Sequence, residues 1–173
     1  MSKQEARLLL LFAGFMMDSV LSYFLPFSYT KNNLMCVPCI GMMFFIFLNH
    51  YMNRQDRIVY SIGVGLYFAI IYAHSLLIYV IIYGVIGFAG AKYERLSSFS
   101  FTETLLFILA MFIGKEIVIF MMMKITGITF LSLATYLTCR LVPSIALNIG
   151  LFIPAYYGFK KYQEIAVEKG YIC

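Results

Sequence analysis

Four charged side chains stand within stretches that are otherwise apolar, and they have the greatest potential for chemistry. They are Asp18, Lys115, Glu116 and Arg140. If these stretches cross a membrane, each buried charge is costly, so it is expected to face the bundle interior and to find a partner. Two roles remain open for them. They line a pathway for protons or ions, or the two acids and two bases neutralise each other as internal struts.

Depth along the helices suggests how these charges pair. At 1.5 Å per residue, Asp18 and Lys115 lie about 16 and 18 Å from the charged ends of their helices. Because both helices enter from the same side, we predict an ion pair between Asp18 and Lys115. Glu116 points about 100° further round its helix. It is expected to reach Arg140 or to pair with backbone and hydroxyl groups.

The sequence CVPC at residues 36–39 places two cysteines in a C-x-x-C pattern. In a thioredoxin-like setting this pattern indicates a redox pair, but here no βαβ pattern surrounds it. The other interpretation is two small apolar cysteines, with Pro38 kinking the start of a helix. A membrane oxidoreductase that depends on Cys36 and Cys39 is therefore one of three functional hypotheses for this protein.

No other chemical motif stands out. The sequence has no metal-ligand spacing of His, Cys, Asp and Glu, no glycine-rich phosphate loop and no Ser-His-Asp set. We therefore predict a protein that is not an enzyme and that has no catalytic residue, cofactor or metal.

Composition identifies the class of protein. Of 173 residues, 62% are hydrophobic and 12% are charged, with a net charge of +5. Soluble domains average about 45–50% apolar and about 25% charged residues. This composition excludes a soluble enzyme, a nucleic-acid-binding domain and a disordered chain. An integral membrane protein remains.

The lengths of the apolar runs and the charged residues between them then divide the chain into spans. The apolar run 58–91 would be about 50 Å long as one helix, against a hydrocarbon core of about 30 Å, so we place a break near His74. The prediction is an all-α polytopic membrane protein with one membrane-embedded domain over residues 1–173. Its six transmembrane helices are expected at about 7–27, 34–52, 58–73, 76–91, 103–125 and 141–159, with an interfacial helix at about 129–139.

The positions of the basic residues set the orientation. With six spans and cytoplasmic termini, nine Lys and Arg residues lie inside and three lie outside. The inner set is Lys3, Arg7, Arg54, Arg57, Lys92, Arg95, Lys160, Lys161 and Lys169, and the outer set is Lys31, Lys124 and Arg140. This excess agrees with the positive-inside rule.

Two segments of the last third of the chain carry a family resemblance. They read GKEIV at 114–118 and RLVPSIALN at 140–148. The chain resembles the rod-shape-determining membrane protein MreD family. That family has an acidic residue in the fifth span, an Arg-x-x-Pro opening the sixth and an Asn five residues after the Pro. The matching residues are Glu116, Arg140, Pro143 and Asn148.

The resemblance covers mainly residues 114–161. Asp18 also matches an acidic residue of the family's first span. One departure is that the family often has an Asp near the end of the third span, whereas residues 69–72 are uncharged. Any role of that Asp is therefore not carried over to this chain.

The resemblance implies a non-enzymatic scaffold of the bacterial cell-wall elongation machinery in the inner membrane. Its implied partners are an MreC-like bitopic protein, the RodA glycosyltransferase with its class B penicillin-binding protein, and an MreB-like actin homologue on the cytoplasmic face. Membrane lipid is a further contact, and nucleic acid is not expected.

The family is also similar in fold to the substrate-binding subunits of energy-coupling-factor transporters. The alternative function is therefore a subunit of that kind, which binds a vitamin or a metal. Its candidate ligand residues are Asn32, Asn33, His74, Thr135 and Arg140.

Overall fold

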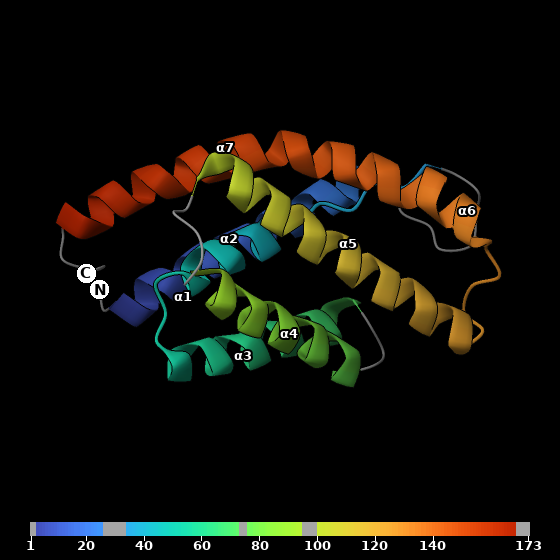
Figure 1. Cartoon of the computed structure of the whole chain (residues 1–173), viewed down its shortest axis with the longest axis horizontal. Helices are drawn as coiled ribbons and strands as arrows, with labels where there is room; N and C mark the ends of the chain where they lie inside the picture. Colours follow the sequence, from blue (N-terminus) through green and yellow to red (C-terminus); the bar gives the residue numbers. More distant parts are fainter. Residues whose placement is uncertain (1–2, 26–33, 73–75, 95–99, 169–173) are drawn as a thin grey trace. The chain divides into compact units, whose positions relative to one another are not determined.

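The described part of the chain is helical. A computed structural model describes residues 3–25, 34–72, 76–94 and 100–168, in which all regular structure is helix. The elements in order are α1 (Lys3–Phe24), α2 (Ile40–Asn49), α3 (Arg54–Tyr72), α4 (Leu76–Glu94), α5 (Phe101–Ile125), α6 (Leu133–Tyr136), the π-helical turn η1 (Leu137–Leu141) and α7 (Val142–Glu168) (Figure 1). The all-α prediction is confirmed for these residues.

The chain divides into two compact units. The first comprises residues 1–44 and 105–173, and the second comprises residues 45–104. The first unit contains α1, the start of α2, most of α5, and the run from α6 to α7. The second contains the end of α2, the pair α3 and α4, and the first residues of α5. The single membrane-embedded domain expected from the sequence stays a prediction.

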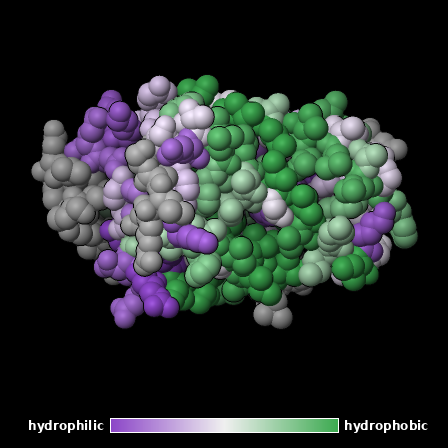
Figure 2. Space-filling model, viewed as in Figure 1, coloured by the Kyte–Doolittle hydropathy of each residue, from purple (hydrophilic) through white to green (hydrophobic). Residues whose placement is uncertain are grey.

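Several helices are long and apolar enough to cross a membrane. Among the residues that the structure describes, three helices meet this description, at Glu5–Phe24, Phe101–Ile125 and Leu133–Ile165, and the segments Ile40–Asn49 and Ile78–Tyr93 are shorter apolar helices. Large apolar side chains are exposed on them, such as Leu9 at 56% and Phe12 at 54%. Hydrophobic residues cover a broad part of the face seen in Figure 2. The full count of six spans stays a prediction.

The second predicted span is not one helix. Residues 34–39 are not helical, and α2 begins only at Ile40. Pro38 explains the difference, because it lacks an N–H and disfavours helical backbone in the residue before it. If 34–39 is extended, this segment and α2 together reach about 35 Å, more than the about 30 Å of a hydrocarbon core.

The predicted interfacial helix at 129–139 is likewise replaced. Residues 129–132 are not helical, and the helix that begins at Leu133 continues through η1 into α7 (Figure 1). Ser132 caps its start by accepting a hydrogen bond from the Thr135 N–H. Pro143 falls just after the wider π turn, where the helical hydrogen-bond pattern has already changed. The run therefore passes Pro143 without ending.

In the second unit, α3 and α4 pack closely as an antiparallel pair. A Cβ atom added to Gly65 of α3 would lie 2.5 Å from the Cα of Val80 on α4. Phe68 stacks on Tyr83 with a centroid distance of 5.0 Å, and on Tyr79 at 6.0 Å. A small residue at 65 therefore lets the two backbones approach, which is how helices associate in lipid.

This close approach gives a stability prediction. Gly65→Ala is expected to destabilise the protein by about 1–3 kcal/mol, because the added methyl group meets the α4 backbone, which cannot move aside cheaply. Gly63→Ala is the matched control, since nothing lies within 4 Å of an added Cβ there. We expect the control to gain up to about 1 kcal/mol from helix propensity. The measurement is reversible unfolding in detergent, and equal stability of the two variants would contradict the close packing.

Candidate functional site

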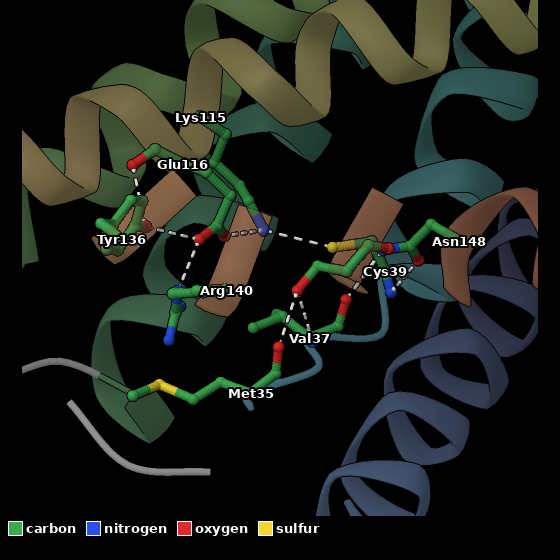
Figure 3. A network of polar contacts seen from close by, with 9 residues as sticks. Met35, Val37, Cys39, Lys115, Glu116, Tyr136, Arg140 and Asn148 are labelled. Carbon is green, nitrogen blue, oxygen red and sulfur yellow. Dashed lines mark hydrogen bonds and ion pairs between the residues drawn. The ribbon is translucent and has the colours of Figure 1, made fainter. Parts of the chain in front are cut away.

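A buried cluster of charges lies in the first unit (Figure 3). Glu116 is its centre: Oε1 lies 3.3 Å from Lys115 Nζ, and Oε2 lies 2.9 Å from Arg140 Nε. The Tyr136 hydroxyl donates to the same Oε2 at 2.9 Å. The side chain of Glu116 is 1% exposed and that of Arg140 is 3% exposed. The carboxylate is therefore fully enclosed by donors.

Two helical segments position this cluster. Lys115 and Glu116 are successive residues of α5, whereas Tyr136 and Arg140 are four residues apart and share one face of the α6–η1 run. The Tyr136 hydroxyl also donates to the Glu116 carbonyl oxygen at 3.2 Å, and its ring packs on Phe120 with a centroid distance of 4.3 Å. The cluster therefore fastens α5 to η1.

Lys115 also connects the cluster to segment 34–39. Its Nζ donates to the Cys39 Sγ at 3.2 Å and lies 5.1 Å from the centre of the Phe112 ring. The Lys115 residue is 7% exposed. The ammonium group is therefore held between the Glu116 carboxylate, an aromatic face and a thiol.

Two side chains of α7 bind the backbone of segment 34–39. Asn148 accepts from the Cys39 N–H at 2.9 Å and donates to the Val37 carbonyl at 2.8 Å. Ser144 accepts from the Val37 N–H at 3.0 Å. Ser144 and Asn148 are four residues apart on α7, so both reach the same segment. Their side chains supply hydrogen bonds that a helix would otherwise provide to this stretch.

The proline of the Arg-x-x-Pro motif fits the same arrangement. In a regular helix the N–H of residue 143 would donate to the carbonyl of residue 139, but Pro143 has no N–H. The Cys139 carbonyl instead accepts from the Met35 N–H at 2.8 Å. Pro143 therefore leaves an acceptor for the end of segment 34–39.

Asp18 of α1 caps the start of α2. Its two carboxylate oxygens accept from the Ile40 N–H at 2.7 Å and from the Gly41 N–H at 2.8 Å. These N–H groups belong to the first turn of α2 and have no partner within that helix. A negative charge is also favoured there by the helix dipole. Position 41 needs a glycine, because an added Cβ would collide with the Phe15 ring.

The arrangement satisfies non-helical backbone in an apolar setting. In hydrocarbon, each unsatisfied N–H or C=O costs several kcal/mol, so such backbone occurs only where protein groups bond it. Here Asp18, Ser144 and Asn148 supply those bonds. The formal charges of Asp18, Lys115, Glu116 and Arg140 sum to zero. These features are typical of an internal strut.

Comparison of the chain with protein-family models, with curated proteins and with solved structures gives no match.

The structure brings the sequence-predicted residues together but changes one pairing. Glu116 contacts both Arg140 and the Tyr136 hydroxyl, in agreement with the two alternatives predicted for it. The ion pair predicted between Asp18 and Lys115 is replaced. Lys115 pairs with the neighbouring Glu116, and Asp18 binds backbone N–H groups. The reason is that segment 34–39 is not helical, so α2 begins only at Ile40 and its first N–H groups are available to Asp18.

Three participants were not predicted from the sequence, namely Tyr136, Ser144 and Cys39 as an acceptor for Lys115. One signal was present: Arg140, Ser144 and Asn148 recur every four residues and so share a helix face. No such signal exists for Cys39, because its contact depends on the path of segment 34–39.

The residues proposed for a vitamin or metal ligand are placed only in part. Asn32, Asn33 and His74 lie outside the described residues. Thr135 and Arg140 line a cavity of about 10 Å³, which has room for about one water molecule. Within the described ranges, no group of three or more His, Cys, Asp or Glu residues could hold a metal ion.

The C-x-x-C cysteines hold different positions. Both have free thiols, with Cys39 buried and Cys36 partly exposed. The backbone N–H of Cys39 and its Sγ are bound to Asn148 and Lys115. These contacts give Cys39 a structural part in the strut.

Asn148 gives a second stability prediction. Asn148→Ala is expected to cost about 2–4 kcal/mol, because the Cys39 N–H and the Val37 carbonyl lose buried partners at about 1–3 kcal/mol each. Glu164→Ala, at an exposed position of the same helix, is expected to change stability by less than about 0.5 kcal/mol. Unfolding in detergent measures both. A loss of the same size in the two variants would argue against the backbone clamp.

Proposed function

We propose that this protein is a non-enzymatic membrane scaffold of the bacterial cell-wall elongation machinery, of the MreD family, which binds an MreC-like bitopic protein. One observation carries the proposal: the residues that define the resemblance form one buried network. Glu116 and Arg140 pair directly, Pro143 leaves the Cys139 carbonyl to Met35, and Asn148 binds the same segment. A short motif with a shared structural purpose supports the family assignment better than scattered identities would.

The burial of the motif favours an internal role over direct contact with a partner. Arg140 is 3% exposed and Asn148 is 1% exposed. A partner's side chains therefore cannot reach them without opening the network. The motif residues act as struts that hold the helices in the shape that a partner recognises. The partner therefore binds the exposed apolar surface of the helices. In lipid, helices associate through close packing of such surfaces.

A scaffold of this kind reaches its machinery through partners. The MreC-like protein would link it to the RodA glycosyltransferase and its class B penicillin-binding protein, and an MreB-like actin homologue would lie on the cytoplasmic face. The chain would reside in the inner membrane with both termini in the cytoplasm. The several membrane-length apolar helices support a membrane location.

Affinity purification from membranes at native expression tests the proposal. We expect an MreC-like bitopic protein to co-purify, and no small molecule to be present in stoichiometric amount. A stoichiometric vitamin without that partner would overturn the proposal in favour of a transporter subunit. Loss of function on Cys36→Ser alone would instead indicate redox chemistry.

The expected orientation has its own test. In intact cells, a cysteine introduced by Lys31→Cys is expected to react with a membrane-impermeant thiol reagent, and one introduced by Gln55→Cys is not. The reason is that position 31 follows the first crossing and position 55 follows the second. Labelling is compared with the parent chain, which carries four cysteines of its own. The reverse pattern would contradict cytoplasmic termini.

A further inference from the structure

A groove with a basic end and an apolar end lies between α3 and α4 of the second unit. We call it the α3–α4 groove, and it has a volume of about 630 Å³. It is lined by Arg54, Arg57, Ile58, Ser61, Ile62, Gly84, Gly87, Phe88, Ala91 and Lys92. This volume falls within the range of about 300–1,000 Å³ that is usual for small ligands.

The charges gather at one end because the two helices are antiparallel. Arg54 and Arg57 are in the first turn of α3, and Lys92 is in the last turn of α4. None of the lining residues is acidic. Neither Arg54 nor Lys92 forms an ion pair within 4 Å with any residue that the structure describes, and both residues are exposed. This end of the groove therefore offers two accessible cations to an anion.

Arg57 has a different role, which is structural. It donates to the carbonyl oxygens of Asn49 and Met52 at 2.7 and 3.1 Å. It therefore holds the connection that follows α2, and its substitution would change the fold as well as the groove. Arg54 and Lys92 are therefore the residues whose substitution tests the charge of the groove separately from the fold.

The other end of the groove is apolar and open. Ile62 and Gly84 line it, and Ile58 and Phe88 line the stretch between the two ends; the side chains of Ile58, Ile62 and Phe88 are exposed. Nothing lies within 4 Å of a Cβ added to Gly84, so the missing side chain leaves room. At 1.5 Å per residue, the lining extends about 12 Å from position 54 to position 62. The groove is therefore short, open and apolar, with positive charge at one end.

We propose that the α3–α4 groove binds an anionic phospholipid, with its phosphate at Arg54 and Lys92 and part of an acyl chain beside Gly84 and Phe88. Charge complementarity supports this occupant, since cations at one end and apolar side chains at the other match an anionic amphiphile. The basic end lies on the predicted cytoplasmic side, where anionic headgroups attract Lys and Arg near the membrane surface. The lining extends about 12 Å along α3, which is less than half of the about 30 Å that a transmembrane helix occupies.

Native mass spectrometry of the full chain in neutral detergent tests the proposal, with phosphatidylglycerol and phosphatidylcholine supplied in equal amounts. We expect phosphatidylglycerol to be retained at least about fivefold more than phosphatidylcholine. The double variant Arg54→Gln with Lys92→Gln is expected to lose this preference. Lys160→Gln with Lys161→Gln removes two exposed basic residues from α7 and is expected to keep it.

A second variant tests the apolar end independently of charge. Gly84→Leu places a side chain into open space in the groove and is expected to reduce phosphatidylglycerol retention about tenfold. Gly63→Leu is the matched control, with equally open space on α3 outside the lining. Size-exclusion profiles check that each variant is folded.

Three outcomes would overturn the proposal. The first is equal retention of the two lipids by the parent chain. The second is an equal loss in the Lys160 and Lys161 double variant, which would indicate general surface charge. The third is displacement of the lipid by an equal concentration of glycerol phosphate, which would indicate a headgroup site without a chain channel.

Discussion

Glu116→Gln is expected to destabilise the protein by about 3–5 kcal/mol, the loss that follows removal of one partner from a buried ion pair. Glutamine keeps the size of the side chain but removes the negative charge that faces Lys115 Nζ at 3.3 Å and Arg140 Nε at 2.9 Å. Two buried cations would then repel each other in a setting of low dielectric constant. The measurement is the free energy of unfolding in detergent.

Glu103→Gln is the matched control for this experiment. Glu103 lies in the first turn of the same helix and is exposed. Its neutralisation is expected to change stability by less than about 0.5 kcal/mol. If the two variants lose equal stability, Glu116 is not the centre of a buried cluster.

A double-mutant cycle separates the pair from general loss of charge. Arg140→Gln alone is expected to be strongly destabilising, because it removes the 2.9 Å partner of Glu116 Oε2. In a chain that already carries Glu116→Gln, the same change is expected to cost at least about 1 kcal/mol less, since contacting residues are not additive. Strict additivity would contradict a direct interaction between them.

The sequence indicates the helices better than it indicates the backbone between them. The lengths of the apolar runs and the charged residues between them predict α1, α3, α4 and α5 to within a few residues. The apolar run that begins at residue 34 also predicts a helix, because hydropathy alone does not distinguish a buried helix from a buried extended segment. Pro38 is the one local mark of the change, and its effect on the residues before it is a bias and not a rule.

The site shows the same limit at the level of single contacts. The direction of Glu116 around its helix suggests Arg140 as a partner, because both side chains bear full charges that require partners. Depth along the helices suggests the wrong direct partner for Asp18, because its partners are backbone N–H groups, which a list of charged residues does not contain. Lys115 nevertheless binds the residue next to one of these donors, because its Nζ donates to the Cys39 Sγ and Asp18 accepts from the Ile40 N–H. The sequence therefore predicts which residues lie near one another better than it predicts which atoms bond.

Asp18→Ala is expected to be the other strongly destabilising change, with a loss of about 2–5 kcal/mol. The Ile40 and Gly41 N–H groups would each lose a buried acceptor at about 1–3 kcal/mol, and hydrogen bonds to a charged acceptor are the stronger ones. Asp18→Asn keeps one carbonyl oxygen, so its loss is expected to fall between that of Asp18→Ala and that of the parent chain. Unfolding in detergent ranks the three proteins.

Amide hydrogen exchange shows where that loss arises. If Asp18 caps α2, Asp18→Ala speeds exchange first at residues 40 and 41, because their N–H groups are the ones released. Ser19→Ala is the matched control, since the Ser19 hydroxyl donates one turn back within α1, to the Phe15 carbonyl oxygen at 3.0 Å. We expect that control to leave residues 40 and 41 protected. Faster exchange spread evenly over α1 and α2, with no lead at these two amides, would mean that Asp18 supports the bundle generally and does not anchor the start of α2.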